Sequence, residues 1–247
     1  MNIGLCGLGK AGQEFVKYIL KSDEFILRQV LCREQSKTAG KNVSEVTGLL
    51  TYSEIPITKI SEFRNIKNLD VIIVDFSNSI TSLNLLDICA KFKVNLVICT
   101  TNFSEYQLNF IEKMANVYDI GVVYAPTLTI GINILLKFVK NLSILFPEFS
   151  FTIIEKHGKN KDCPTRTAKI ISNNIDKEDT KILSVRLNGY VGIHEVIATD
   201  GYERITIEHE SFSRSAFVRG SLIASKFIYK RKGFFTMKDV MENLMLR

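Results

Sequence analysis

The first half of the chain alternates short apolar runs with stretches in which apolar residues recur every three or four positions. The runs that read as buried strands are residues 2–7, 25–32, 70–77, 95–102 and 120–126. Between them, residues 11–22 and 82–92 have the period of amphipathic helices. This alternation predicts a parallel sheet covered by helices on both faces.

The second half follows a different pattern. Residues 130–146 have a helical period, and a further helix is expected near Ala168. The segments that read as strands are residues 151–157, 181–188, 191–199 and 203–211. Few helices separate them, so we expect an α+β domain with a mixed or antiparallel sheet. The tail, residues 215–245, returns to helical periodicity and is expected to pack on the first domain.

The amino-acid composition limits the kinds of protein that this chain can be. Of 247 residues, 46% are hydrophobic and 23% charged, which is ordinary for a soluble globular enzyme. The sequence has no run of eighteen apolar residues and no signal-peptide pattern, so we expect a cytoplasmic protein without a membrane partner.

The charged residues and the cysteines narrow the choice further. The net charge of +6 is spread along the chain without a nucleic-acid-binding motif, so it fits solvation and an anionic small ligand better than nucleic acid. The five cysteines form no CxxC pair and no zinc-ligand spacing, which predicts reduced thiols and no metal site.

The sequence GLGKAG follows the first predicted strand directly and opens the first predicted helix. A GxGxxG at this boundary lets the backbone approach a pyrophosphate at a helix N-terminus. The alternative is a tight turn that binds nothing, but the position of the motif favours a dinucleotide site. The residues concerned are Gly7, Leu8, Gly9, Lys10, Ala11 and Gly12.

The end of the second predicted strand bears on the choice of dinucleotide. An acidic residue that binds ribose hydroxyls is expected there, but Cys32 stands at that position and Glu34 lies two positions beyond it. Arg33 can meet a 2′-phosphate, which makes NADP at least as good a candidate as NAD. Arg33 as a solvated loop charge remains the alternative.

Three later strand ends are rich in small hydroxyl residues. In a doubly wound sheet, ligands collect beyond the carboxyl ends of the strands. We therefore expect a nicotinamide to be bordered by Phe76, Thr100, Thr101, Pro126, Thr127, Leu128 and Thr129.

The segment EKHGKNKDCPTRTA, residues 155–168, concentrates positive charge before a predicted helix start. Lys159, Lys161 and Arg166 would surround the N-terminus of that helix and form an anion site. The alternative is a solvated charged loop. His157 at the end of a strand favours a functional site.

These motifs together resemble the dihydrodipicolinate reductase family nearly end to end. The family pattern E-x-H-H-x-x-K-x-D-A-P-S-G-T-A is matched by Glu155, His157, Lys161, Asp162, Pro164, Thr167 and Ala168. Further similar segments are residues 74–77, 100–101, 131–133, 191–196, 207–225 and 233–241.

The resemblance implies an α/β fold with a Rossmann-like dinucleotide-binding domain, residues 1–127 and 216–247. A substrate-binding and tetramerisation domain, residues 128–215, would have a mixed sheet. NADPH or NADH would reduce 4-hydroxy-tetrahydrodipicolinate, a small dicarboxylate, in the diaminopimelate and lysine pathway, and the chain would form a homotetramer. His157 would be the acid/base group and Lys161 the proton donor.

The departures from the family pattern mark a diverged member. Gly158 replaces a second histidine, and Thr165, Arg166 and Thr167 replace the S-G-T loop that binds a substrate carboxylate, in which Thr167 would supply a backbone N–H. Cys99 replaces the usual glycine at the cofactor site.

Two other functions stay open on these departures: an imine reductase for a different anionic substrate, and a catalytically silent homologue. Retention of His157 and Lys161 favours an enzyme. His194 and His209 are expected to be structural histidines of the sheet. Arg214 would either reach the cofactor side or stabilise the loop that carries Lys161.

Overall fold

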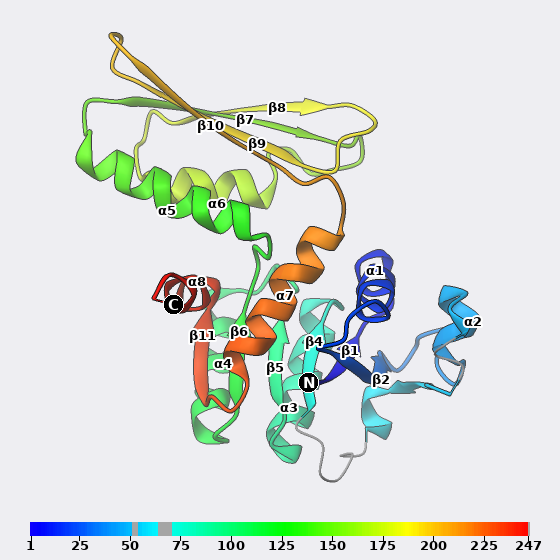
Figure 1. The fold of residues 1–247 in the computed structure, drawn as a ribbon. Coiled ribbons are helices and arrows are strands. Elements are labelled where there is room, and N and C mark those ends of the chain that lie inside the picture. The colour runs from blue at the N-terminus through cyan, green and yellow to red at the C-terminus, as the bar shows by residue number, and fades with distance from the viewer. Residues whose placement is uncertain (51–53, 64–70, 247) are drawn as a thin grey trace. The chain divides into compact units, whose positions relative to one another are not determined.

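The computed structural model describes residues 1–50, 54–63 and 71–246. The chain divides into two compact units, Met1–Leu128 with Phe217–Arg247, and Thr129–Ala216 (Figure 1). Among the helices of the described residues, none combines the length and the apolarity needed to span a bilayer.

The first unit is built on a seven-stranded sheet in the order β11-β6-β5-β4-β1-β2-β3, in which all neighbouring strands are parallel. The strands are β1 (Asn2–Cys6), β2 (Ile26–Cys32), β3 (Ile57–Lys59), β4 (Val71–Asp75), β5 (Asn95–Ile98), β6 (Gly121–Tyr124) and β11 (Gly233–Thr236). The order reverses between β1 and β4, which is the position where such sheets bind ligands.

The helical elements of this unit follow the strands. They are α1 (Lys10–Ile19), α2 (Val43–Thr47), the 3₁₀ turn η2 (Ile60–Glu62), α3 (Ser79–Phe92), α4 (Glu105–Val117), α7 (Ser215–Ile228) and α8 (Met237–Met245). The first two residues of α7 belong to the other unit. The predicted Rossmann-like fold is confirmed.

Alternate residues of the parallel strands face two separate cores. Ile72 and Val74 of β4 pack in a cluster with residues of α1, α7 and α8, whereas Ile73 packs in a second cluster with residues of α3 and α4. This is the alternation expected of a strand buried on both faces.

Two short strands were not predicted from the sequence. The tail was expected to be helical, but β11 lies between α7 and α8 and pairs with β6. Its four residues, and the three residues of β3, are too few to show an alternating pattern, so tertiary pairing decides their conformation.

The second unit has a mixed four-stranded sheet in the order β10-β9-β7-β8, as predicted. Its strands are β7 (Ser150–His157), β8 (Lys181–Arg186), β9 (Ile193–Thr199) and β10 (Arg204–Glu210). β7 and β8 are parallel, and the other pairs are antiparallel. Helices α5 (Ile130–Leu145) and α6 (Arg166–Ile175) cover one face, which we call the inner face (Figure 1).

Strand register places a polar row across this inner face. Ile153 and Val196 are register partners in the core. Two residues beyond Ile153 on β7, Glu155 lies between Ser184 of β8 and His194 of β9. His194 in turn pairs with His209 of β10. At this end of the sheet, positions that face the core therefore carry titratable side chains, where apolar ones would be expected.

Candidate active site

The GLGKAG turn forms an open helix N-terminus in the first unit. Gly7 has a φ of +91°, and a Cβ on Gly12 would lie 2.0 Å from the carbonyl oxygen of Gly7, so both positions require glycine. A Cβ on Gly9 would meet no described atom within 4 Å. Because α1 starts after Gly9 and carries no acidic residue in its first turn, its N–H groups and dipole suit a diphosphate.

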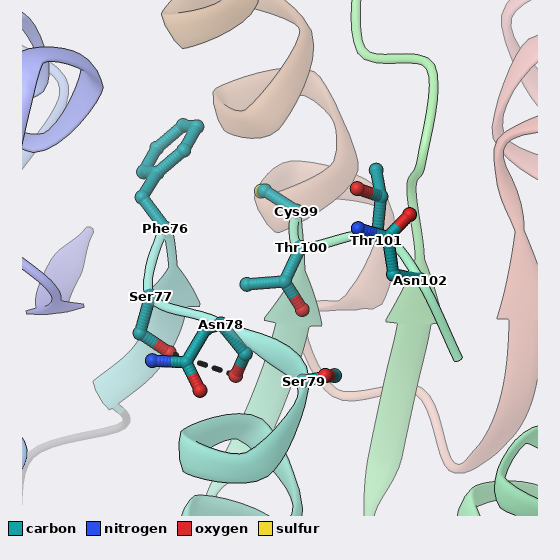
Figure 2. A pocket seen from close by; sticks show the side chains of 8 residues that line it. All are labelled: Phe76, Ser77, Asn78, Ser79, Cys99, Thr100, Thr101 and Asn102. Atoms are coloured by element: carbon teal, nitrogen blue, oxygen red, sulfur yellow. Dashed lines mark hydrogen bonds between the residues drawn. The ribbon is translucent and has the colours of Figure 1, made fainter. Parts of the chain in front are cut away.

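A cavity of about 300 Å³ lies beyond the carboxyl ends of β4 and β5 (Figure 2). The structure brings Phe76, Cys99, Thr100 and Thr101 together there, at two neighbouring strand ends. The remaining lining residues are Ser77, Asn78, Ser79 and Asn102. Asn78 accepts a hydrogen bond from the Thr81 N–H at 3.0 Å and so begins α3 at the cavity.

The other predicted cofactor residues follow β6. Pro126 and Thr127 are half-buried and Leu128 is buried; none of the three lines this cavity. Thr129 is buried and is the first residue of the second unit, where it precedes α5.

Asp75, which the sequence analysis did not single out, anchors the floor of this cavity. Its carboxylate is fully buried and accepts hydrogen bonds from the Ser77 N–H at 2.9 Å, the Ser77 hydroxyl and the Ser82 hydroxyl. Ser82 Oγ also lies 2.7 Å from Thr100 Oγ1. Burial raises the pKa of Asp75, although the bonds from Ser77 and Ser82 oppose the shift. One carboxyl group therefore ties the loop after β4 to α3 and to the loop after β5.

Cys99 faces the cavity as a neutral thiol. Burial raises the pKa of Cys99 well above its ordinary value, and the nearby charge of Asp75 adds to that effect. Because the thiolate is the nucleophile, this side chain can line a binding site without being reactive.

At the end of β2, Glu34 is held away from a ligand. Its carboxylate accepts hydrogen bonds from the Ser61 N–H at 3.0 Å and the Ser61 hydroxyl at 2.8 Å. Cys32 is buried, so Arg33 is the exposed charge directly after the strand.

In the second unit, Glu155 is the centre of the polar row. Its buried carboxylate accepts hydrogen bonds from Thr165, from the Ser184 hydroxyl at 2.6 Å and from Nη2 of Arg186 at 2.6 Å. Burial alone would raise the pKa of Glu155, but the bonds from Arg186, Ser184 and Thr165 outweigh it and hold the pKa at about 2. Glu155 is therefore ionised and fixed in place at neutral pH.

His157 and His194 form a buried pair beside this carboxylate. Their Nε2 atoms are 3.4 Å apart, and each is 3.9 Å from Oε2 of Glu155. Burial lowers both pKa values, that of His194 to about 3, so both rings are neutral at neutral pH. Gly192 makes room for this pair, because a Cβ there would lie 2.8 Å from Cε1 of His157.

His194 was expected to be a structural histidine, and the structure places it against a predicted catalytic residue. Its Nδ1 is buried and finds no hydrogen-bond partner among the described residues. The signal that could have found it is the alignment of two predicted strands, which brings Glu155 opposite His194.

Glu155, His157 and His194 lie close enough together to be considered as a metal site. The carboxylate is poorly suited to that role, because four donor groups already occupy its lone pairs and one of them is the Arg186 cation. The cluster suits proton chemistry better than a bound cation.

The loop after β7, residues 158–165, carries the remaining predicted residues. Lys161 is exposed, and its N–H donates to the Gly158 carbonyl at 3.1 Å in a tight turn. Arg186 donates to the carbonyls of Lys161 and Asp162. The loop is thus held at the end of the polar row, beside His157.

Helix α6 starts where this loop ends and contains Ala168, near which a helix was expected. Thr165 is its buried N-cap residue; its hydroxyl accepts from the Ala168 N–H at 3.3 Å and donates to Glu155. Thr165 therefore helps to hold the buried Glu155 in place. Arg166 and Thr167 occupy the first turn of α6, whose N–H groups have no acceptor inside the helix.

Residues 1–128 match the family profile described as dihydrodipicolinate reductase, N-terminus, and residues 131–241 match the profile of the C-terminus. The chain belongs to the dihydrodipicolinate reductase family. This confirms the resemblance seen in the sequence and makes the chain a member of a family of NAD(P)H-dependent oxidoreductases.

Two named relatives align with most of this chain. The 4-hydroxy-tetrahydrodipicolinate reductase of Buchnera aphidicola subsp. Schizaphis graminum is 30% identical, over 96% of this chain and 94% of that protein. The reductase of the same name from Thermosipho africanus is 35% identical, over 71% of this chain and 80% of that protein.

A solved structure supports the fold of this reductase. Dipicolinate-bound dihydrodipicolinate reductase from Paenisporosarcina sp. TG-14 superposes with a TM-score of 0.79 at 23% identity, over 96% of this chain and 97% of that one.

Proposed function

We propose that this protein reduces 4-hydroxy-tetrahydrodipicolinate to tetrahydrodipicolinate with NADPH or NADH, in the diaminopimelate and lysine pathway. The observation that carries the proposal is the site of the second unit. An exposed lysine lies in a loop fixed to a buried carboxylate, next to a neutral histidine pair and to a helix N-terminus.

The two parts of the chain would have different functions. Residues 1–127 and 216–247 would bind the dinucleotide, and residues 128–215 would bind the substrate and assemble the oligomer. The open N-terminus of α1 and the cavity beside Phe76 support the first assignment, and the polar row of the sheet supports the second.

The 4-hydroxyl group would leave as water, because the product lacks it. Reduced nicotinamide, when bound, would supply a hydride to the resulting conjugated ring, and the negative charge that develops on the ring must be neutralised by a proton. Lys161 is the group that donates this proton, a role worth roughly 100- to 10,000-fold in rate. His157 would accept or return a proton as a neutral imidazole, because burial lowers its pKa. The Glu155 carboxylate opposes this shift, and the cations Arg186 and Lys161 add to it.

The substrate carboxylates would be held at the start of α6. The N–H groups of Arg166 and Thr167 and the helix dipole favour an anion there. The Arg166 guanidinium offers a bidentate partner in place of the imidazole that Gly158 lacks. A Cβ at Gly158 would come no closer than 3.8 Å to the Tyr190 carbonyl oxygen, so this position leaves space for a ligand.

The cofactor would lie with its diphosphate on the turn from Gly9 to Ala11. Its nicotinamide would lie near Phe76, Cys99 and the loop from Pro126 to Thr129. Arg33 offers a partner to a 2′-phosphate, while Ser61 holds the carboxylate that would favour ribose hydroxyls. We therefore expect NADPH to be used at least as well as NADH.

The partners would be the small dicarboxylate and further copies of the chain, in a cytoplasmic homotetramer. The outer face of the second sheet supports self-assembly, because Leu183 and Val185 of β8 are 53% and 37% exposed there. Ile154 of β7 is the neighbour of Leu183 in register, so the apolar surface is continuous.

The test is oxidation of NADPH, and separately of NADH, followed by absorbance with enzymatically generated substrate. Lys161→Ala should lower kcat roughly 100-fold or more while the Kd of NADPH stays unchanged. Lys181→Ala, at an exposed lysine that begins β8 at the other end of the sheet from His157, is the control and should behave as wild type.

Two outcomes would argue against the proposal. Equal losses of turnover and cofactor binding in Lys161→Ala would make that lysine structural. Wild-type protein that binds NADPH but does not oxidise it would favour an imine reductase with a different anionic substrate, for which Gly158 and Arg166 are the distinguishing residues.

A further inference from the structure

Arg186 ends β8 and pairs in register with His157. Its Nη2 donates to Oε1 of Glu155 at 2.6 Å and to the Asp162 carbonyl at 2.5 Å, and its Nε donates to the Lys161 carbonyl at 3.1 Å. One guanidinium therefore joins a buried carboxylate to two consecutive carbonyls of the loop that carries Lys161.

We infer that Arg186 is a positioning residue for proton transfer, which fixes the main chain of Lys161 relative to His157. This inference rests on the proposed function, since it assigns Arg186 a role only through Lys161. The Lys161 side chain is exposed, so its direction depends on where the loop backbone is held.

The geometry requires arginine rather than any cation. The guanidinium is planar and has five N–H donors in a fixed fork, and three of its nitrogens are used here: Nη1 also donates to the Val185 carbonyl at 3.0 Å. A lysine could pair with Glu155, but a single ammonium group could not also hold the carbonyls of Lys161 and Asp162 in these directions.

Glu155 is a rigid partner for Arg186. The Glu155 carboxylate also accepts hydrogen bonds from Thr165 at the start of α6 and from Ser184 on β8, so it is held in place independently of Arg186. The loop is thereby tied to the same buried group at two points, at its end through Thr165 and in its middle through the contact of Arg186 with Asp162.

Lys177 offers a matched comparison within the same unit. Its Nζ donates to the carbonyls of Pro147 and Phe149, each at 2.6 Å, and to that of Phe146 at 3.5 Å, just before β7 begins. It is likewise a cation that holds backbone carbonyls, but at the end of β7 opposite to His157. A purely structural brace is therefore available as a control.

The experiment compares Arg186→Lys, Arg186→Ala and Lys177→Ala in full-length enzyme. We expect both Arg186 variants to lose roughly 10- to 100-fold in kcat, with a smaller change in the KM of NADPH, because a small displacement of a catalytic group costs about that much. Lys177→Ala should lower the unfolding midpoint and leave kcat within about twofold, since it is remote from the loop.

Chemical rescue separates positioning from stability. Millimolar guanidinium should restore part of the kcat of Arg186→Ala, and it should not restore that of Lys161→Ala. Hydrogen exchange should also show faster exchange of the amides in residues 158–165 for both Arg186 variants, and no change there for Lys177→Ala.

Three results would overturn the inference. The first is an Arg186→Lys enzyme with wild-type kcat, and the second is an Arg186→Ala enzyme whose loss of kcat guanidinium does not reverse. The third is unchanged exchange of residues 158–165 in both variants. The exchange measurement needs no turnover, so it remains decisive even if the wild type fails to reduce the proposed substrate.

Discussion

His194 couples the stability of the second unit to pH. Burial and the neighbouring His157 ring lower its pKa to about 3, whereas an unfolded histidine titrates near 6.5. As pH falls below about 6.5, His194 binds a proton in the unfolded state but not in the folded state, so the free energy of unfolding decreases. One such site contributes up to about 1.4 kcal/mol per pH unit.

We therefore predict that His194→Gln flattens the dependence of the unfolding free energy on pH between 6 and 5. Urea unfolding at several pH values measures this slope. Glu155 does not interfere, because its lowered pKa costs stability only as pH falls below about 4.5. His157 and His209 also have lowered pKa values, so some slope remains. A slope equal to that of the wild type would show that His194 is not held neutral.

The residues of this site differ in how far the sequence could predict them. His157 and Lys161 lie in one short motif, and a local pattern was enough to propose them. Arg186 and His194 reach Glu155 from positions 31 and 39 residues further along the chain. Their contacts depend on the register between β7, β8 and β9, which a single sequence does not determine.

At the scale of elements, the glycines of the turn before α1 have two separate functions. A Cβ on Gly12 would lie 2.0 Å from a backbone oxygen, whereas a Cβ on Gly9 would project into open space where a diphosphate is expected. Gly12→Ala should therefore destabilise the first unit, and Gly9→Ala should leave its stability unchanged.

The same pair of variants tests the cofactor site. Gly9→Ala should weaken NADPH binding by roughly tenfold or more, because the added methyl group keeps the pyrophosphate from the N–H groups of α1. Fluorescence titration gives the Kd, and thermal unfolding gives the stability. Undiminished affinity in a folded Gly9→Ala protein would contradict a diphosphate at this helix.

The parallel sheet was predictable because its central strands are buried on both faces and read as continuous apolar runs. The start of α6 was predictable too, since the helix expected near Ala168 begins with Thr165 as an ordinary N-cap. The local pattern did not show that the hydroxyl and the N–H of Thr165 also bind Glu155, because that contact is tertiary.

At the scale of the whole molecule, the outer face of the second sheet is the feature that a single chain does not explain. The inner face is covered by α5 and α6, but Leu183 and Val185 of β8 and the following Leu187 are between 37% and 53% exposed. Fully burying an exposed side chain of this kind contributes about 1.5–3 kcal/mol, so each of these half-exposed side chains would contribute roughly half of that. Repeated across symmetric copies, that is enough to favour assembly.

We predict that Leu183→Glu dissociates the proposed homotetramer without unfolding the chain. A charge in the middle of an apolar contact loses its hydration on association, so the interface loses both the leucine and the free energy of desolvating the carboxylate. Light scattering after size exclusion should report a smaller particle than the wild type, while circular dichroism stays the same. Leu50→Glu, the same change at an 84% exposed leucine of the first unit, is the control and should leave the mass unchanged. If Leu183→Glu kept the wild-type mass, the proposed interface on β8 would be wrong.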